Sequence, residues 1–339
     1  MSSFISCNFP QSVINPKDIV GAGGFGVVYG LKFNQNTVIK CIGSTLKCSE
    51  GKEEFTTSRT LIKKLSESDA YKNPYIINLF IPYPFCQSNE KFEINECEEK
   101  LSNKKVDCEG TKYSCTIMME KVPYFNPEIK LSYQLYLLDE IKQLPDDPLD
   151  GRVMYNQKKI PRGLFIDENH LLNLEKSYKN FSAIHTVFSL GYWVGKLLID
   201  CKFDLKDVEY ILSRNGTDVC LYMIDFGMST FWNTQADLIE TCENLQIEPT
   251  LPSSKSNKYY NQFLSGFVEY VRSCSKNTSE EHKKYTNIVL EKFFETTPEQ
   301  SIEIYNDNLK LLIELKKNNY KYNKKYNKKY NKKSYSDKR

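Results

Sequence analysis

The sequence predicts an α+β, bilobal fold, with a small lobe built on an antiparallel sheet and a large lobe that is mainly helical. Three observations support this fold class. A glycine-rich stretch, residues 20–29, is flanked by β-branched and aromatic residues, which is typical of two strands joined by a turn. A second apolar run, residues 219–224, ends abruptly at Asp225-Phe226-Gly227, as a buried strand ends at a surface turn. Residues 182–198 have the wide apolar surface of a core helix.

Length and composition limit the class of protein. The 339 residues can bury a sizeable core, so we expect one large domain of two lobes or two small domains. No apolar stretch reaches the roughly 18 residues of a membrane helix, and no charged start precedes an apolar segment at Met1. We therefore expect no membrane span and no export, and a location in the cytoplasm or nucleus.

The cysteines and histidines do not form a recognisable metal motif. Eleven cysteines contain no Cys-x-x-Cys pair, and the chain has only three histidines. We therefore expect reduced thiols and no zinc site. The alternative is a disulfide or a metal cluster among Cys97, Cys108 and Cys115, which lie close together in the sequence.

Positive charge is concentrated in the C-terminal tail. Residues 316–339 carry eleven Lys or Arg against one acid, so the tail has a charge of +10; the whole chain has +3 and the remainder therefore −7. The tail contains Tyr-Asn-Lys-Lys three times, a low-complexity composition that cannot bury a core and is expected to be disordered. It is interpreted as a solvated extension, or else as an attachment to nucleic acid or an anionic surface.

The glycine-rich stretch has the spacing Gly-x-Gly-x-x-Gly-x-Val. In a dinucleotide-binding fold such glycines lie between a strand and a helix. Here strand-forming residues follow them, which favours a hairpin whose backbone amides approach phosphate oxygens. Lys40 ends a Val-Ile-Lys strand twelve residues after Val28, where its ammonium would neutralise phosphate charge. The nucleotide-binding residues predicted here are Gly21, Gly23, Gly24, Phe25, Gly26, Val28 and Lys40.

Together with Asp225-Phe226-Gly227, the glycine hairpin and Lys40 resemble the eukaryotic protein-kinase fold. The resemblance implies an ATP site in which Asp225 binds a Mg²⁺ ion that bridges the phosphates. Residues 50–66 have helical periodicity and resemble the family's regulatory helix, which offers a glutamate to the strand lysine. The position expected for this glutamate is Ser58, and Glu54, one turn earlier on the same face, is the substitute candidate.

Residues 115–122 resemble the last strand of the small lobe and the hinge after it. This implies that Met119 lines the adenine pocket and that the backbone of Glu120 to Val122 hydrogen-bonds the base. Residues 74–79 are similar to the turn and strand that follow the regulatory helix. The expected division is a small ATP-binding lobe at 1–122, with a hairpin-and-loop insertion at 86–114, and a large lobe at 123–315, with an insertion at about 123–180.

The expected catalytic segment departs from the kinase pattern. Asp204-Leu205-Lys206 matches the family's Asp-Leu-Lys, which implies that Asp204 orients an acceptor hydroxyl and places Lys206 beside it in the catalytic segment. The preceding histidine and arginine are absent, and Tyr210 stands where the second metal-binding asparagine belongs. Tyrosine is a poor Mg²⁺ ligand, so Glu209 is the replacement candidate.

A narrower resemblance covers residues 161–227. Residues 207–212 read Asp-Val-Glu-Tyr-Ile-Leu and are similar to a sequence block of a largely fungal family of uncharacterised kinase-like proteins. After Thr230 no Ala-Pro-Glu follows within thirty residues. The remaining large lobe is expected to contain helices at 259–273, 280–295 and 301–315.

Two functions from different classes follow from the resemblance. The first is a Ser/Thr-type phosphotransferase that uses Mg²⁺ and ATP, with a protein or a small molecule as acceptor. The alternative is a pseudokinase, a binding or scaffold module with little or no phosphotransfer. Each 1.4 kcal/mol of lost transition-state stabilisation slows a reaction about tenfold. The departures at Ser58 and Tyr210 and the missing histidine and arginine would therefore slow phosphotransfer by several orders of magnitude, even in a chain that still binds the nucleotide.

Overall fold

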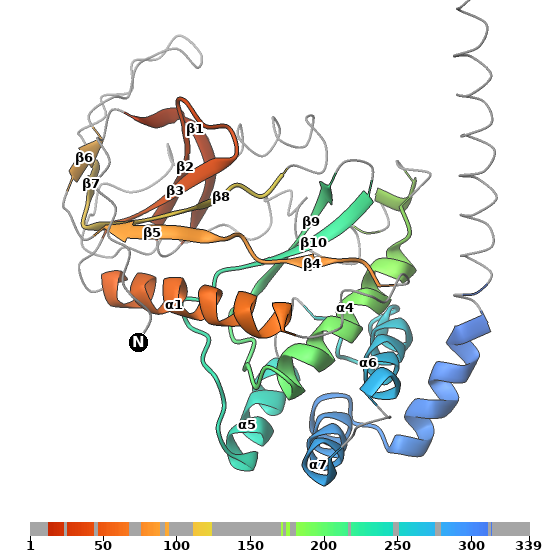
Figure 1. Ribbon diagram of the computed structural model, residues 1–339. Coiled ribbons are helices and arrows are strands. Elements are labelled where there is room, and N and C mark those ends of the chain that lie inside the picture. Colours follow the sequence, from red (N-terminus) through yellow and green to blue (C-terminus); the bar gives the residue numbers. More distant parts are fainter. Residues whose placement is uncertain are drawn as a thin grey trace, which may run out of the picture. The chain divides into compact units, whose positions relative to one another are not determined.

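A computed structural model describes most of the two predicted lobes. The described residues are 13–23, 26–43, 47–67, 76–88, 92–94, 111–123, 171, 174–176, 181–215, 218–246, 251–274, 279–310 and 313. They form an α+β protein with a small antiparallel sheet and a helical part, as predicted (Figure 1). The tail at 316–339, most of the insertion at about 123–180, and Gly24, Phe25, Cys97 and Cys108 lie outside the described residues.

The chain divides into two compact units, each made of separate stretches of sequence. The first comprises Met1–Lys72, Asn78–Asp167 and Leu205–Phe231, and the second comprises Asn73–Ile77, Glu168–Asp204 and Trp232–Arg339. The segment with Asp225-Phe226-Gly227 thus belongs to the same unit as the glycine hairpin and Lys40.

A five-stranded sheet forms the core of the first unit. Its strand order is β1-β2-β3-β8-β5, and every neighbouring pair is antiparallel. The strands are β1 Ile14–Gly23, β2 Gly26–Leu31, β3 Thr37–Ile42, β8 Cys115–Glu120 and β5 Pro84–Ser88. Gly23 pairs with Gly26 at the end of the β1–β2 ladder, so the glycines lie between two strands, as predicted.

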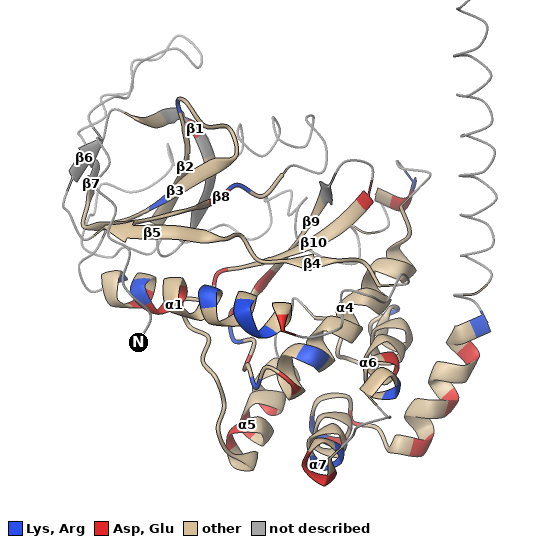
Figure 2. Ribbon diagram, in the orientation of Figure 1, with Lys and Arg blue, Asp and Glu red and all other residues tan. Residues whose placement is uncertain are grey.

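Helix α1, Lys47–Ser66, packs against this sheet through β5, β8 and β3. Its apolar residues Phe55, Leu61 and Leu65 are buried because they recur at helical spacing on one face. Lys, Arg and acidic residues are mixed along the rest of the helix (Figure 2). The predicted regulatory helix is therefore present as a helix, and one of its faces is fixed on the strand that carries Lys40.

A disulfide joins the start of α1 to the sheet. Cys48 on α1 is bonded to Cys115 on β8 across a sequence separation of 67 residues. The prediction that the cysteines are reduced thiols is therefore wrong for this pair. The bond cannot be predicted from cysteine spacing, because the two cysteines become neighbours only when α1 packs on the sheet. Phe55 and Ile117 then lie beside Cys115.

The segment that follows α1 contributes a strand to a three-stranded sheet with the order β4-β10-β9. The strand predicted at residues 74–79 is β4, Leu79–Phe80, which pairs in parallel with β10, Asp218–Ile224. β10 also pairs antiparallel with β9, Glu209–Asn215. Leu79 and Leu221 are both fully buried, so their pairing belongs to the apolar core of the unit.

The insertion at residues 86–114 contains the predicted hairpin. β6, Phe92–Ile94, pairs antiparallel with β7, Thr111–Tyr113, in a two-stranded sheet. The part of the insertion between these strands lies outside the described residues.

Helices form the described part of the second unit. They are α4 Ala183–Ile199, α5 Gln235–Gln246, α6 Tyr260–Cys274 and α7 Glu280–Ile288, which continues as a π-helical turn at Val289–Phe293; residues 298–310 are also helical. Ser182 caps α4 by accepting a hydrogen bond from the His185 amide. Apart from Lys196, α4 carries no charge along its length (Figure 2), and it is almost wholly buried.

Helices α4 and α6 pack at very short range. A Cβ added at Gly191 would lie 1.9 Å from the Phe263 carbonyl oxygen, and one added at Gly266 would lie 1.8 Å from that of Phe188. Further along, a Cβ at Gly195 would meet the Tyr270 ring. Near the C-terminal ends of both helices the Tyr270 hydroxyl donates to Asp200 Oδ1, so α4 and α6 run in the same direction (Figure 1).

Helix α5 was not predicted. Its N-terminal end carries a reciprocal cap, in which the Thr234 hydroxyl accepts from the Asp237 amide and the Asp237 carboxylate accepts from the Thr234 amide. The Thr-x-x-Asp spacing was the available signal, and the weak apolar periodicity of the helix obscured it. Across the described ranges, every helix is too short or too polar to cross a bilayer.

Candidate functional site

Three charged side chains of the first unit meet in a buried group, the Lys40 cluster (Lys40, Glu54 and Asp225). The Lys40 ammonium lies 2.7 Å from Glu54 Oε2 and 3.2 Å from Asp225 Oδ1. The exposed fractions of the side chains are 11% for Lys40, 9% for Glu54 and 29% for Asp225. A strand, a helix and a turn that are far apart in the sequence each supply one member.

The charges of the Lys40 cluster depend on one another. Burial alone would lower the pKa of the Lys40 ammonium, but the carboxylates of Glu54 and Asp225 overcome this effect and raise it. For Glu54, burial raises the pKa, the Lys40 ammonium opposes that rise, and Asp225 adds to it. With Lys40 charged, two ionised carboxylates leave a net charge of −1, which favours a further cation beside the more exposed one, Asp225.

The backbone of Asp225 is held in a sparsely populated conformation. Its φ is +64°, in the left-handed region that costs a non-glycine residue of order 1–3 kcal/mol. Asp225 follows the last residue of β10 directly, and the chain turns at Gly227 and Met228. Leu205 and Asp207, in the segment with Lys206, also have positive φ values, +57° and +58°. Such strain concentrates at binding and catalytic sites.

The glycine hairpin lies against the strand that carries Lys40. Gly26 has a φ of +155°, and a Cβ there would lie 2.1 Å from the Cys41 carbonyl oxygen, so only glycine fits. Val28 pairs directly with Lys40 across β2 and β3, which places both side chains on one face of the sheet. Gly21 and Gly23 end β1, whereas Gly24 and Phe25 lie outside the described residues.

The candidate metal ligand Glu209 and its neighbour Tyr210 point to opposite faces of the sheet that contains β9. Tyr210 pairs with Met223 and is buried, whereas Glu209 pairs with Ile224, the residue before Asp225. Alternate residues of a strand face opposite sides, so Tyr210 turns away from the face that carries Glu209. The Tyr210 hydroxyl has no hydrogen-bond partner in the described part of the chain, and burial raises its pKa far above the usual range.

The predicted hinge already uses part of its backbone. The Glu120 amide donates to the Tyr83 carbonyl and the Lys121 amide to the Asn36 carbonyl. Met119, on β8, borders a small cavity together with Glu54, Asp225 and Phe226. The cavity volume is about 20 Å³, far below the roughly 300–1,000 Å³ of a small-molecule site, so the cavity itself does not hold a nucleotide.

The expected catalytic residues are divided between the units. Lys206 and Glu209 belong to the first unit, and the Ser229 hydroxyl, two residues after Gly227, donates to the Lys206 carbonyl. Asp204 is the last residue of its stretch in the second unit and is half-buried. The placement of Asp204 against Asp225 stays a prediction.

The sequence offered two positions on α1 for the partner of Lys40: Ser58, where the resemblance places a glutamate, and Glu54, one helical turn earlier. The structure pairs Lys40 with Glu54, while the Ser58 hydroxyl donates to the Glu54 carbonyl within α1. The substitute candidate is therefore confirmed as the partner of Lys40. Ser58 also borders the cavity, so a helix face with 3.6-residue periodicity brings both positions to the same side.

No protein-family model matches the chain, and no curated protein matches it. The assignment of a function therefore rests on the residues of the Lys40 cluster and their surroundings.

Proposed function

We propose that the chain is a divergent kinase-like protein that binds ATP with Mg²⁺ at the Lys40 cluster. The observation that carries this proposal is the contact of one buried ammonium with two carboxylates, one from the helix packed on the sheet and one from the turn after β10. A buried lysine needs this compensation, and its ammonium is then held charged and in place for phosphate oxygens.

The residues present suit a Mg²⁺ ion. Mg²⁺ prefers compact oxygen donors and is bound by one or two carboxylates together with substrate phosphates. Asp225 contacts Lys40 through Oδ1 and is the most exposed member of the cluster. Glu209 pairs with Ile224 at the end of the β9–β10 ladder, next to the turn that carries Asp225, and we assign it as the second oxygen donor. Tyr210, on the opposite face, has no part in the site.

The nucleotide would occupy the space under the glycine hairpin. Gly26 and Val28 lie on β2 opposite Cys41 and Lys40, and their backbone is the nearest cover for phosphates. Since the amides of Glu120 and Lys121 are already bonded, the donor left to the base at the hinge is the Val122 amide. Met119 would lie beside the base.

A bound Mg²⁺–ATP would supply the phosphoryl group for a transfer to a hydroxyl acceptor, the Ser/Thr-type reaction of the kinase resemblance. Asp204 would orient that hydroxyl and accept its proton, and Lys206 would balance charge. A specific observation favours the second candidate, a pseudokinase. Phe203 is buried at the position before Asp204, where the kinase pattern has an arginine, so the segment lacks that cation.

Binding is tested by the shift of the thermal unfolding midpoint with Mg²⁺ and ATP. A ligand at about 100 times its Kd stabilises the folded chain by about 2.7 kcal/mol, which is a shift of a few degrees. We expect the shift in the full chain and its loss in Asp225→Asn, which keeps the Lys40–Glu54 pair. Asp218→Asn, an exposed aspartate at the start of the same strand, is the matched control and should keep the shift.

Two results would refute nucleotide binding: no shift in the unchanged chain, or the same shift in Asp225→Asn. Transfer is tested separately, by ATP turnover and by phosphate incorporation into a general acceptor. If the chain is a phosphotransferase, Asp204→Asn lowers the rate at least a hundredfold without changing the thermal shift. Equal background rates for the two proteins would assign the chain to the pseudokinase alternative.

A further inference from the structure

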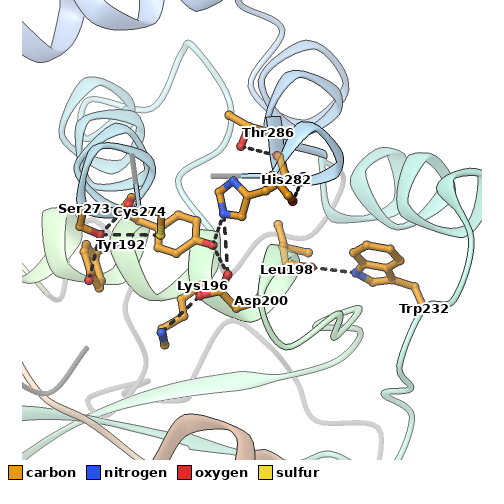
Figure 3. Close-up of polar contacts among 11 residues, drawn as sticks. Tyr192, Lys196, Leu198, Asp200, Trp232, Ser273, Cys274, His282 and Thr286 are labelled. Atoms are coloured by element: carbon orange, nitrogen blue, oxygen red, sulfur yellow. Dashed lines mark hydrogen bonds and ion pairs between the residues drawn. The ribbon is translucent and has the colours of Figure 1, made fainter. Parts of the chain in front are cut away.

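The ends of three helices in the second unit bring a carboxylate, a thiol and an imidazole together (Figure 3). Asp200 is the C-cap of α4, Cys274 is the last residue of α6, and His282 lies in the first turn of α7. Their ligand atoms all lie within 4.8 Å of one another. Asp200 Oδ1 and His282 Nε2 are 3.7 Å apart.

These donors are of the kinds that bind zinc, and their atoms lie close enough for small side-chain movements to bring them onto one ion. Zn²⁺ prefers thiolate sulfur, imidazole nitrogen and carboxylate oxygen in a tetrahedral arrangement. Metal–ligand bonds of about 2.0–2.3 Å at tetrahedral angles put neighbouring ligand atoms about 3.3–3.6 Å apart. We propose that Asp200 Oδ1, Cys274 Sγ and His282 Nε2 bind Zn²⁺, with water in the fourth position, since Asp200 is exposed. The ion displaces the thiol proton of Cys274 to solvent.

Two neighbouring side chains hold the carboxylate of this site. The Lys196 ammonium lies 3.3 Å from Asp200 Oδ2, the oxygen that the ion does not use. The Tyr270 hydroxyl lies 2.7 Å from Asp200 Oδ1 and 2.9 Å from His282 Nε2. On zinc binding it keeps its bond to Asp200 and releases the imidazole nitrogen. Hydrogen-bonding partners of this kind orient the ligands of most protein metal sites.

The ligands are too far apart in the sequence to form a recognisable motif, which is why the spacing of cysteines and histidines predicted no zinc site. Seventy-three residues separate Asp200 from Cys274, and the parallel packing of α4 and α6 makes them neighbours. His282 then follows from the start of α7. This zinc site does not depend on the proposed nucleotide site, because all of its residues belong to the second unit.

Titration with Co²⁺ tests the site directly, because a cobalt–thiolate bond gives a charge-transfer band that oxygen and nitrogen ligands do not. The full chain is titrated in a buffer with a non-thiol reductant. We expect one Co²⁺ per chain, displaced by Zn²⁺, and at least tenfold weaker binding in Cys274→Ser and His282→Asn. Cys220→Ser and His185→Asn are the matched controls and should bind as the unchanged chain does. No thiolate band, or an unchanged band in Cys274→Ser, would overturn the proposal.

A second measurement needs no substitution and so does not depend on the folding of a variant. Cys274 is half-buried and is not part of a disulfide. Its alkylation rate is followed by peptide mass spectrometry with and without Zn²⁺. We expect the ion to slow alkylation of Cys274 at least tenfold, and Mg²⁺ to leave it unchanged. Equal rates with and without Zn²⁺ contradict the assignment of Cys274 as a ligand.

Discussion

The two units each hold an aspartate beside a lysine, and they do so in different ways. Lys40 and Asp225 are 3.2 Å apart in space and 185 residues apart in sequence, and Glu54 completes the group. Lys196 and Asp200 are 3.3 Å apart and separated by one helical turn. The first pair exists only when a strand, a helix and a turn have assembled, whereas the second needs only α4. The first unit therefore fixes its site by charge, and the second by the packing of helices.

Substituting Gly266 tests the helix packing and should give the largest effect. In Gly266→Ala the new Cβ would lie 1.8 Å from the Phe188 carbonyl oxygen, which is backbone and cannot move aside. We expect a loss of about 3 kcal/mol in the free energy of unfolding, measured by denaturant titration. Gly51→Ala on α1 is the control, since its Cβ would meet the ends of the Ile42 and Ile117 side chains and no backbone atom. Equal losses for both would contradict the distinction between the units.

Substituting Glu54 tests the charge pairing of the first unit. In Glu54→Gln the buried Lys40 ammonium loses the nearer of its two carboxylate partners, so we expect a loss of about 2–3 kcal/mol in the free energy of unfolding. Glu53→Gln, on the exposed side of the same helix, should change it by less than about 0.5 kcal/mol. The comparison is made by urea unfolding near pH 7. Unchanged stability in Glu54→Gln would mean that the pair does not hold α1.

The hydroxyl groups of two buried tyrosines, one in each unit, differ in their hydrogen bonding. The buried Tyr210 hydroxyl has no partner among the described residues, while the Tyr260 hydroxyl donates to the Phe294 carbonyl at 2.6 Å. Tyr260→Phe should lose about 1–2 kcal/mol of unfolding free energy, and Tyr210→Phe should be neutral or stabilising by up to about 1 kcal/mol. Calorimetry of both variants measures the difference. Tyr210→Phe should also leave the Mg²⁺–ATP shift unchanged.

The cap of α5 should give the smallest effect and one that depends on pH. Hydrogen bonds from the Asn233 and Thr234 amides lower the pKa of Asp237 from its ordinary value of 3.8. Its contribution to stability is therefore present above that value and is lost as the pH falls through the lower, folded-state pKa. In Asp237→Asn the thermal midpoint should depend less on pH between about pH 5 and pH 2 than in the unchanged chain. Asp307→Asn, on an exposed helix face, should leave this dependence unaltered.

The parts of the fold that follow from local sequence were predicted. The hairpin at Gly23 and Gly26, the strand before Asp225 and the helices α1, α4, α6 and α7 all have residue patterns that match their periodicity. Lys40, Glu54 and Asp225 could be proposed together because each stands at a recognisable place on its own element. Two contacts could not be predicted: the parallel pairing of Leu79 with Leu221 and the Cys48–Cys115 bond. Each joins segments that become neighbours only through packing.

The absence of side chains at Gly191 and Gly266 has a consequence beyond stability. Asp200 stands nine residues after Gly191, and Cys274 eight residues after Gly266, at the ends of two parallel helices. The close approach of α4 and α6 at these glycines therefore sets the distance between the Asp200 carboxylate and the Cys274 thiol. A single methyl group placed more than two helical turns away would widen that gap, so the geometry of the proposed zinc site depends partly on residues that never touch the ion.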